Sequence, residues 1–225
     1  MALQTVRTPE PAPSRLMVQT VRTPLRQTLS DVWTLGIENA LIWGCPTHRL
    51  LAHYQKHLGD RHIEAGVGSG YLLDRARFPS KRPRLLLLDQ NQSALDFSRR
   101  RLRRYAPRIQ LVDLREPIEF DDQYDSAALH YVLHTLPGSW SQKAVVFAQL
   151  KKAMHTGAPI FGATILGSGL PPSRARDELL RLYNARGIFH NAHDDADGLA
   201  LALQQHFERY EIELVGSIAL FAGYR

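Results

Sequence analysis

The sequence contains a single cysteine, Cys45, and no long apolar run among its 225 residues. One thiol cannot form an intramolecular disulfide or build a cysteine-based metal site, and it suits a reducing cytoplasm. No segment approaches the roughly 18 consecutive apolar residues of a transmembrane helix, and the first residues lack the apolar stretch of a secretory signal. These absences favour a cytoplasmic protein that does not bind a membrane.

The first 29 residues differ in composition from the rest of the chain. The hexapeptide QTVRTP occurs at residues 4–9 and again at 19–24, and three prolines fall within residues 9–13. Proline at this density opposes helices and central strands, so residues 1–29 are predicted to form a flexible arm. Alternatively, the arm folds over a substrate. A single domain is predicted over residues 30–225, with a helical cap at 30–60 and a core at 61–225.

A glycine-rich turn is the most informative feature that is present. Residues 64–70 read EAGVGSG, after a segment that can end a strand and before one that can begin a helix. Nineteen residues after Gly70, a second apolar run ends in Asp89. Such a turn, followed about 20 residues later by an acid, is typical of an adenosine-binding site in an α/β sheet. Asp89 can then accept hydrogen bonds from both ribose hydroxyls.

Spacing and charge narrow the choice of adenosine ligand. A dinucleotide site has its third glycine one residue later, where this sequence has Tyr71. No Gly-Lys-Ser/Thr follows, which excludes a nucleoside triphosphate loop. Glu64 stands two residues before the first glycine. Its carboxylate suits a ligand with an ammonium and a sulfonium better than it suits a pyrophosphate.

In these residues the sequence resembles the class I S-adenosylmethionine-dependent methyltransferases, whose first motif is an acid-x-Gly-x-Gly-x-Gly run after strand 1. The resemblance covers about residues 60–225: Asp89 matches the ribose-binding acid, and segments 124–130, 157–164, 210–216 and 218–224 match strands 4 to 7. It implies a Rossmann-like α/β fold, a doubly wound seven-stranded sheet with helices on both faces. The implied strand order is 3-2-1-4-5-7-6, with strand 7 antiparallel. An unrelated Rossmann-like binding domain with chance glycines is the alternative.

The resemblance also implies an enzyme that uses S-adenosyl-L-methionine, releases S-adenosyl-L-homocysteine and needs no metal. The donor is expected to contact the glycine turn and the ends of the first four strands, where Asp113 and Leu114 match the pair that meets the adenine. The predicted cofactor-binding residues are Glu64, Gly66, Gly68, Gly70, Asp89, Gln90, Asp113, Leu114 and His130.

The acceptor side is predicted from histidines beyond the ends of the strands, where ligands of open α/β sheets bind. His130 and His134 follow the fourth strand, and His190 lies in an insertion at about 167–200. A histidine that titrates near neutrality can serve as a general base, so the catalytic candidates are, in order, His134, His130 and His190. For each, the alternative is a structural hydrogen bond to the backbone. The predicted walls of the acceptor pocket are Trp33, Trp43, Tyr131, Phe189 and Asn191, with core packing as the alternative for the tryptophans.

The segment HYVLHTLPG after the fourth strand lacks the Asn/Asp-Pro-Pro-aromatic motif of nucleobase methylases and the paired glutamates of protein arginine enzymes. The expected reaction is therefore methyl transfer to O, N or S of a small molecule, such as a specialised metabolite, by a monomer or homodimer. The alternative function is a non-catalytic protein that binds the donor or its product for regulation or assembly.

An arginine cluster and a histidine pair are both interpreted as surface residues without a specific function. Six arginines at residues 99–108 are predicted to be a solvated helix face, although such a cluster can also bind nucleic acid. No nucleic-acid partner is expected. His53 and His57, four residues apart on a helix capped by Thr47, are predicted to form a surface pair.

Overall fold

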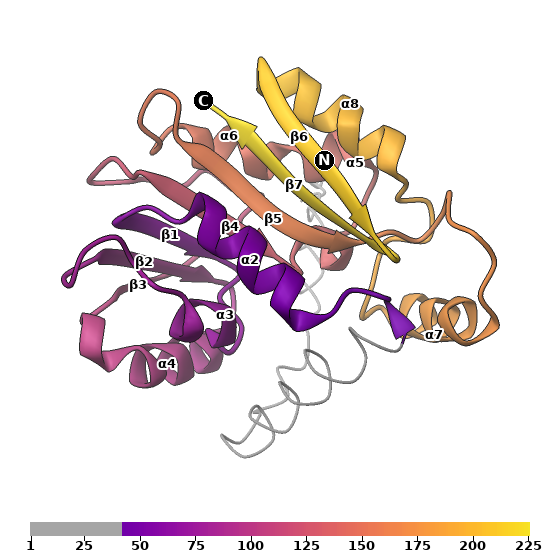
Figure 1. Ribbon diagram of the computed structural model, residues 1–225, viewed down its shortest axis with the longest axis horizontal. Coiled ribbons are helices and arrows are strands. Elements are labelled where there is room, and N and C mark those ends of the chain that lie inside the picture. Colours follow the sequence, from indigo (N-terminus) through magenta and orange to yellow (C-terminus); the bar gives the residue numbers. More distant parts are fainter. Residues whose placement is uncertain (1–41) are drawn as a thin grey trace, which may run out of the picture.

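The computed structural model describes residues 42–225. The predicted arm, the first part of the helical cap and Trp33 lie outside the described residues. At the centre is a seven-stranded sheet in the order β3-β2-β1-β4-β5-β7-β6 (Figure 1). Its strands are β1 (Arg61–Ala65), β2 (Arg84–Asp89), β3 (Arg108–Leu111), β4 (Ser126–His130), β5 (Pro159–Ile165), β6 (Arg209–Val215) and β7 (Ile218–Tyr224).

The first five strands are parallel, and β7 is antiparallel to both β5 and β6. The predicted order and the antiparallel last strand are confirmed. The fourth strand begins at Ser126 rather than at residue 124, because Tyr124 makes only an isolated bridge to Met154.

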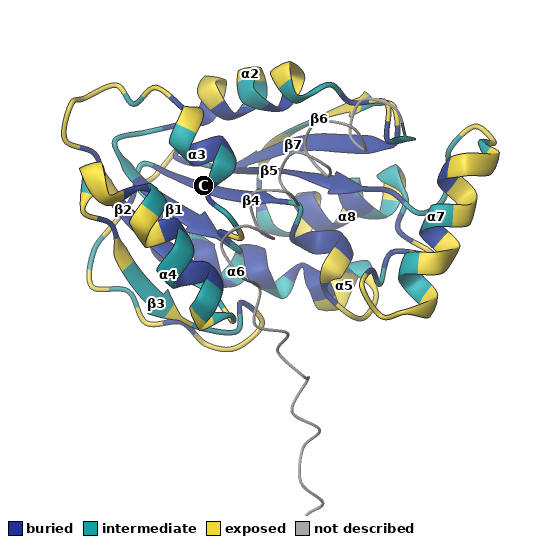
Figure 2. Cartoon of the chain, turned by 90° about the horizontal axis from the view of Figure 1, so that it is seen from below, coloured by how far each residue is buried: buried dark blue, intermediate teal, exposed yellow. Residues whose placement is uncertain are grey.

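Helices cover both faces of the sheet, which is buried between them (Figure 2). The first face carries α2 (Thr47–His57), α3 (Tyr71–Arg75) and α4 (Gln92–Arg101), and the second carries α5 (Trp140–Lys143), α6 (Val145–Lys151) and α8 (Ala196–His206). The helix α7 (Arg174–Ala185) follows the carboxyl end of β5, and η2 (Arg103–Tyr105) and η3 (Leu133–Thr135) are short 3-10 turns. Within the described range, no helix is long and apolar enough to cross a membrane.

Alternation along β1 and β4 places polar side chains on the α2 face of the sheet. Ile63 and Ala65 of β1 belong to the apolar cluster on the opposite face. Since successive side chains of a strand point to opposite faces, His62 and Glu64 point toward α2. The same argument places Ser126 and His130 of β4 on that face. The centre of the sheet beneath α2 is therefore buried but polar.

Two predictions about α2 are wrong. The helix begins at Thr47 itself, with Pro46 at the cap position and no side-chain cap. His53 and His57 are not a surface pair, because their helix stripe faces the sheet. The ring of His57 is buried and lies 5.3 Å from Phe161, and the ring of His53 lies 6.0 Å from His130. Helical spacing alone does not tell which face of a helix is covered.

Candidate active site

The glycine turn joins β1 to α3 at the carboxyl edge of the sheet. Gly66, Gly68 and Gly70 have φ values of +69°, +52° and +67°, a region that favours glycine. A Cβ at Gly66 would lie 2.4 Å from the Cγ2 atom of Val132, so the turn also needs the missing side chain for space. The backbone N–H of Gly66 donates to the carbonyl of Leu88 at 2.7 Å, which fixes the turn over the end of β2.

Asp89, at the end of β2, is bonded to this turn. Its Oδ2 accepts the N–H of Gly68 at 3.1 Å, and its Oδ1 accepts the N–H of Asn91 at 2.9 Å. Burial raises the pKa of Asp89 above its ordinary value, and these backbone hydrogen bonds partly offset that rise. The structure thus brings the predicted ribose acid and the glycine turn together. The contact with ribose itself stays a prediction.

Helix α4 braces the turn from its other side. The Oγ of Ser98 donates to the carbonyl of Gly68 at 2.8 Å, and Nη1 of Arg101 donates to the carbonyl of Ser69 at 2.8 Å. The side chain of Asn91 caps the helix by accepting from the N–H of Ser93. These contacts were not predicted from the sequence. Only the cap could have been, because an Asn directly before a helical pattern indicates the start of a helix.

The predicted adenine-side residues follow β3. The N–H of Val112 donates to the carbonyl of Asp89 at 2.9 Å, so the ends of β2 and β3 adjoin. Nη2 of Arg115 donates to Oδ2 of Asp113 at 2.6 Å. This hydrogen bond lowers the pKa of Asp113. Leu114 is buried and Gln90 is exposed. Their contacts with a donor stay predictions.

Glu64 is buried beneath α2, where the Tyr54 hydroxyl donates to its Oε2. The Nε2 atom of His62 lies 3.1 Å from the same oxygen. The sequence analysis missed His62 as a partner of Glu64. The two residues are two positions apart on one strand, so their side chains point to the same face of the sheet.

The residues after β4 form the opposite side of the site. Tyr131 has a φ of +61°, and its N–H donates to the carbonyl of Ala163 at 2.8 Å. A bulky residue in this region is strained, and such strain clusters at functional sites. Neither ring nitrogen of the buried His130 has a hydrogen-bond partner among the described residues. Burial, and next the neighbouring His53, lower the pKa of His130 well below its ordinary value, so its ring is neutral.

His134, the first catalytic candidate, is only 3% exposed. Burial, with a smaller contribution from the charge of Lys143, lowers its pKa to about 3. Its ring centroid lies 4.5 Å from that of Phe189. The imidazole is therefore neutral at physiological pH and weakly basic, a poorer match to general-base catalysis than a histidine that titrates near neutrality.

The insertion supplies the remaining acceptor-side candidates, and these differ in accessibility. Asn191 is fully buried, and its amide donates to the carbonyl of Ile165 at 2.8 Å. Phe189 packs against Trp43, which is 1% exposed and belongs to the core. His190 is partly exposed, and it lines a cavity of about 670 Å³ together with Gly138, Ser139, Trp140, Ser141, Asn184, Ala192, His193 and Asp194. Of the described pocket candidates, Trp43 and Asn191 thus have the contacts of packing residues.

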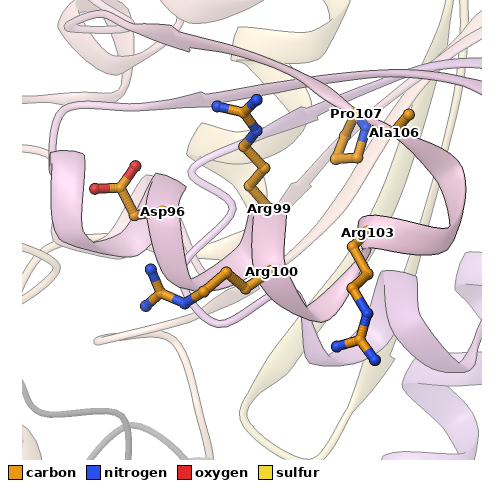
Figure 3. Close-up of a pocket in the computed structure, with 6 residues that line it drawn as sticks. All are labelled: Asp96, Arg99, Arg100, Arg103, Ala106 and Pro107. Carbon is orange, nitrogen blue, oxygen red and sulfur yellow. The ribbon is translucent and has the colours of Figure 1, made fainter.

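The arginine cluster on and after α4 divides into two sets. Arg101 binds Ser69, Arg104 pairs with Asp74, and Arg108 pairs with Asp121. The other three arginines line a groove of about 630 Å³. Figure 3 shows the guanidinium groups of these three side chains pointing in different directions. Diverging side chains are typical of a solvated face rather than of a site that converges on one anion. These three are Arg99, Arg100 and Arg103.

Sequence comparison with known proteins identifies the family to which this chain belongs. No protein-family model matches the chain. It is 35% identical over 185 residues to the demethylluteothin O-methyltransferase of Streptomyces thioluteus, covering 82% of this chain and 80% of that protein. It is 34% identical over 189 residues to the N-methyltransferase vrtF of Penicillium aethiopicum, covering 81% and 77%. The chain belongs to the S-adenosylmethionine-dependent methyltransferases.

Solved structures support the fold of this methyltransferase. The mitomycin 7-O-methyltransferase MmcR is similar with a TM-score of 0.61 and 18% identity, over 90% of this chain and 58% of that one. The N-methyltransferase NodS of Bradyrhizobium japonicum, solved with S-adenosyl-L-homocysteine, is similar with a TM-score of 0.59 and 14% identity, over 92% and 98%. The relatives confirm the family, the enzyme class, the small-molecule type and the donor S-adenosyl-L-methionine, and the solved structures confirm the fold. Within residues 42–225, no group of His, Cys, Asp or Glu side chains is arranged to hold a metal ion.

Proposed function

We propose that this methyltransferase transfers a methyl group to an oxygen or nitrogen atom of a small specialised metabolite. A sulfur atom is the alternative acceptor. The observation that carries the proposal is the meeting of Asp89, the glycine turn and the strained Tyr131 at one edge of the sheet. The names of the relatives support the acceptor class, since they include the physcion biosynthesis cluster O-methyltransferase of Aspergillus chevalieri, 31% identical over 201 residues.

The donor fits the residues on one side of this edge. The bound donor supplies a methyl group that is already activated on a sulfonium. Asp89 would hold the ribose hydroxyls, and the open space around Gly68 would admit the ligand close to the backbone. Glu64 would accept the amino group, and Leu114 would contact the adenine. The protein's main task is to align the donor with the acceptor and to exclude water.

We further propose that alignment, and not a strong general base, carries most of the rate enhancement. His134 is neutral and weakly basic, and His130 is neutral with unpartnered ring nitrogens. An unpartnered buried nitrogen costs about 1–3 kcal/mol of stability. A ligand or a water molecule that forms a hydrogen bond with His130 would recover this free energy. His130 would then orient the acceptor. His134 would shape the pocket, because its Nδ1 accepts the N–H of Ile165 at 3.4 Å and its ring packs on Phe189. His190 would contact it from the insertion, beside a cavity whose volume suits a small molecule.

We propose that the enzyme works as a cytoplasmic monomer or homodimer.

The decisive test of the acceptor class uses S-adenosyl-L-methionine with an isotopically labelled methyl group. The enzyme is incubated with a cell extract that has been separated into small molecules, protein and nucleic acid. We expect label in the small-molecule fraction, and about tenfold to a hundredfold less of it when the variant Asp89→Ala replaces the enzyme at a donor concentration below its dissociation constant. Label in protein or nucleic acid, or in no fraction although the donor binds, would contradict the proposal.

A further inference from the structure

Glu64 lies at the end of a buried chain of hydrogen bonds that crosses from β4 to β1 and α2. The N–H of Gly59 donates to the Oγ of Ser126 at 2.8 Å. That hydroxyl lies 2.7 Å from Nδ1 of His62, and Nε2 of His62 lies 3.1 Å from Oε2 of Glu64. The hydroxyl of Tyr54 donates to the same Oε2 atom. Ser126, His62 and Tyr54 are fully buried, and Glu64 is 5% exposed.

The partners of the chain allow hydrogen bonds that run from Ser126 toward Glu64. Because Ser126 accepts from Gly59, its own proton is available to Nδ1 of His62. Nε2 of His62 can then donate to Glu64. This nitrogen also lies 2.9 Å from the oxygen of Tyr54, so its proton is shared. Each of these polar groups therefore has a partner inside the protein.

Both donors therefore meet one oxygen of the carboxylate and leave the other available. Among the described residues, no hydrogen bond reaches Oε1 of Glu64. Burial, followed by the adjacent charge of Glu64, raises the pKa of Tyr54 well above its ordinary value, so Tyr54 remains a donor at every physiological pH. Glu64 directly precedes Ala65 and the glycine turn, at the carboxyl end of β1. A fixed anion with one open oxygen at this edge suits a cationic group.

We propose that Tyr54, His62 and Ser126 are positioning residues, which hold the Glu64 carboxylate oriented so that Oε1 accepts the amino group of the methyl donor. This inference rests on the donor site proposed above. It assigns a function to α2 beyond packing, because α2 contributes the Tyr54 donor. It also explains why polar residues occupy the centre of the sheet on this face, where apolar residues would pack more simply.

The test compares two ligands that differ in the amino acid part, which carries the amino group. S-adenosyl-L-homocysteine carries it, whereas 5′-methylthioadenosine keeps the adenosine and sulfur and lacks the amino acid part. We expect Tyr54→Phe and Ser126→Ala each to weaken S-adenosyl-L-homocysteine about tenfold in titration calorimetry, a loss of about 1.4 kcal/mol. Affinity for 5′-methylthioadenosine should not change. Glu64→Gln should show the same selectivity with a larger loss, and Ser126→Thr, which keeps the hydroxyl, should recover most of the affinity.

Tyr124→Phe is the matched control, because Tyr124 is also buried but belongs to the apolar cluster on the opposite face. It should change neither affinity. If Glu64→Gln is selective but Tyr54→Phe and Ser126→Ala are not, the positioning inference is overturned while the donor site stands. Equal weakening of both ligands by Tyr54→Phe would show a general structural role and also overturn it. If the unaltered protein binds neither ligand, the proposed donor site fails first.

Discussion

The ammonium of Lys143 lies 2.5 Å from the carboxylate of Asp194, and both side chains are buried. Lys143 also donates to the carbonyl of His190, while the carbonyl of Asp194 accepts the N–H groups of Gly167 and Ser168. Burial lowers the pKa of Lys143, and the hydrogen bond to Asp194 partly offsets this. The pair thus ties the insertion at about 167–200 to α5.

Breaking this pair should destabilise the protein. We expect Lys143→Met to lower the free energy of unfolding by about 3–5 kcal/mol, because it leaves the Asp194 charge buried without a partner. Urea denaturation measures the loss. The double variant Lys143→Met/Asp194→Leu should recover most of it, and Lys81→Met, at an exposed lysine, is the control. An equal effect at Lys143 and Lys81 would show that the pair does not hold the insertion.

The glycines of the turn should differ in their tolerance of a methyl group. At Gly66, alanine would combine a strained φ with a contact of 2.4 Å to Val132, whereas at Gly68 the space is open. Gly66→Ala should therefore weaken S-adenosyl-L-homocysteine binding more than Gly68→Ala, measured by calorimetry. Adding Val132→Ala to Gly66→Ala should restore part of the affinity, since it removes the clashing methyl group. No recovery would mean that backbone strain alone, about 1–2 kcal/mol, accounts for the loss.

The rate of methyl transfer should depend only modestly on the basicity of His134. Because its pKa is about 3, we expect His134→Gln to lower the rate less than about tenfold and to leave the pH profile unchanged between about pH 6 and 9. Steady-state rates with an identified acceptor provide the measurement. A fall of about 10² together with a lost inflection near neutrality would instead show that His134 is the general base.

Stability should fall in mild acid because several buried histidines are neutral in the fold. The pKa values of His53 and His134 are about 3, whereas an unfolded histidine titrates near 6.5. The unfolded state therefore binds more protons between these values, so the stability is fully present above about pH 6.5 and is lost as the pH falls toward 3. At pH 5, His134 alone should account for about 2 kcal/mol.

Urea denaturation at pH 7.5 and at pH 5, roughly one unit above and more than one below the unfolded histidine pKa, measures this loss. His134→Gln should make the free energy of unfolding depend less on pH. His48→Gln, at an exposed residue of α2, should leave the pH dependence unchanged. An unaltered slope in His134→Gln would contradict the buried, neutral state of this histidine.

The fold could be predicted because its evidence is local and ordered along the chain. The glycine turn, the acid at Asp89 and the closing pair of strands each follow from short segments, and the resemblance supplied the strand order. The positions of Asp89 and Gly68 at one edge follow from parallel strands with adjoining carboxyl ends. The contacts of the donor and acceptor remain predictions.

Contacts between distant residues could not be predicted. Lys143 and Asp194 are 51 residues apart, and Ser98 and Gly68 are 30 apart, so neither pair leaves a local pattern. His53 was misplaced because a polar stripe was taken to face solvent, whereas α2 faces a sheet that is itself polar at its centre. Only tertiary packing distinguishes these two arrangements.

We propose that Asp89 belongs to the donor site of this methyltransferase. Titration calorimetry with S-adenosyl-L-homocysteine tests it most directly, on the unaltered protein, on Asp89→Ala and on the control Asp96→Ala in α4. We expect Asp89→Ala to weaken binding by about tenfold to a hundredfold, because a carboxylate that accepts two hydroxyls contributes roughly 1.5–3 kcal/mol. Asp96→Ala should leave the affinity unchanged. Equal affinities for the unaltered protein and Asp89→Ala would contradict the account.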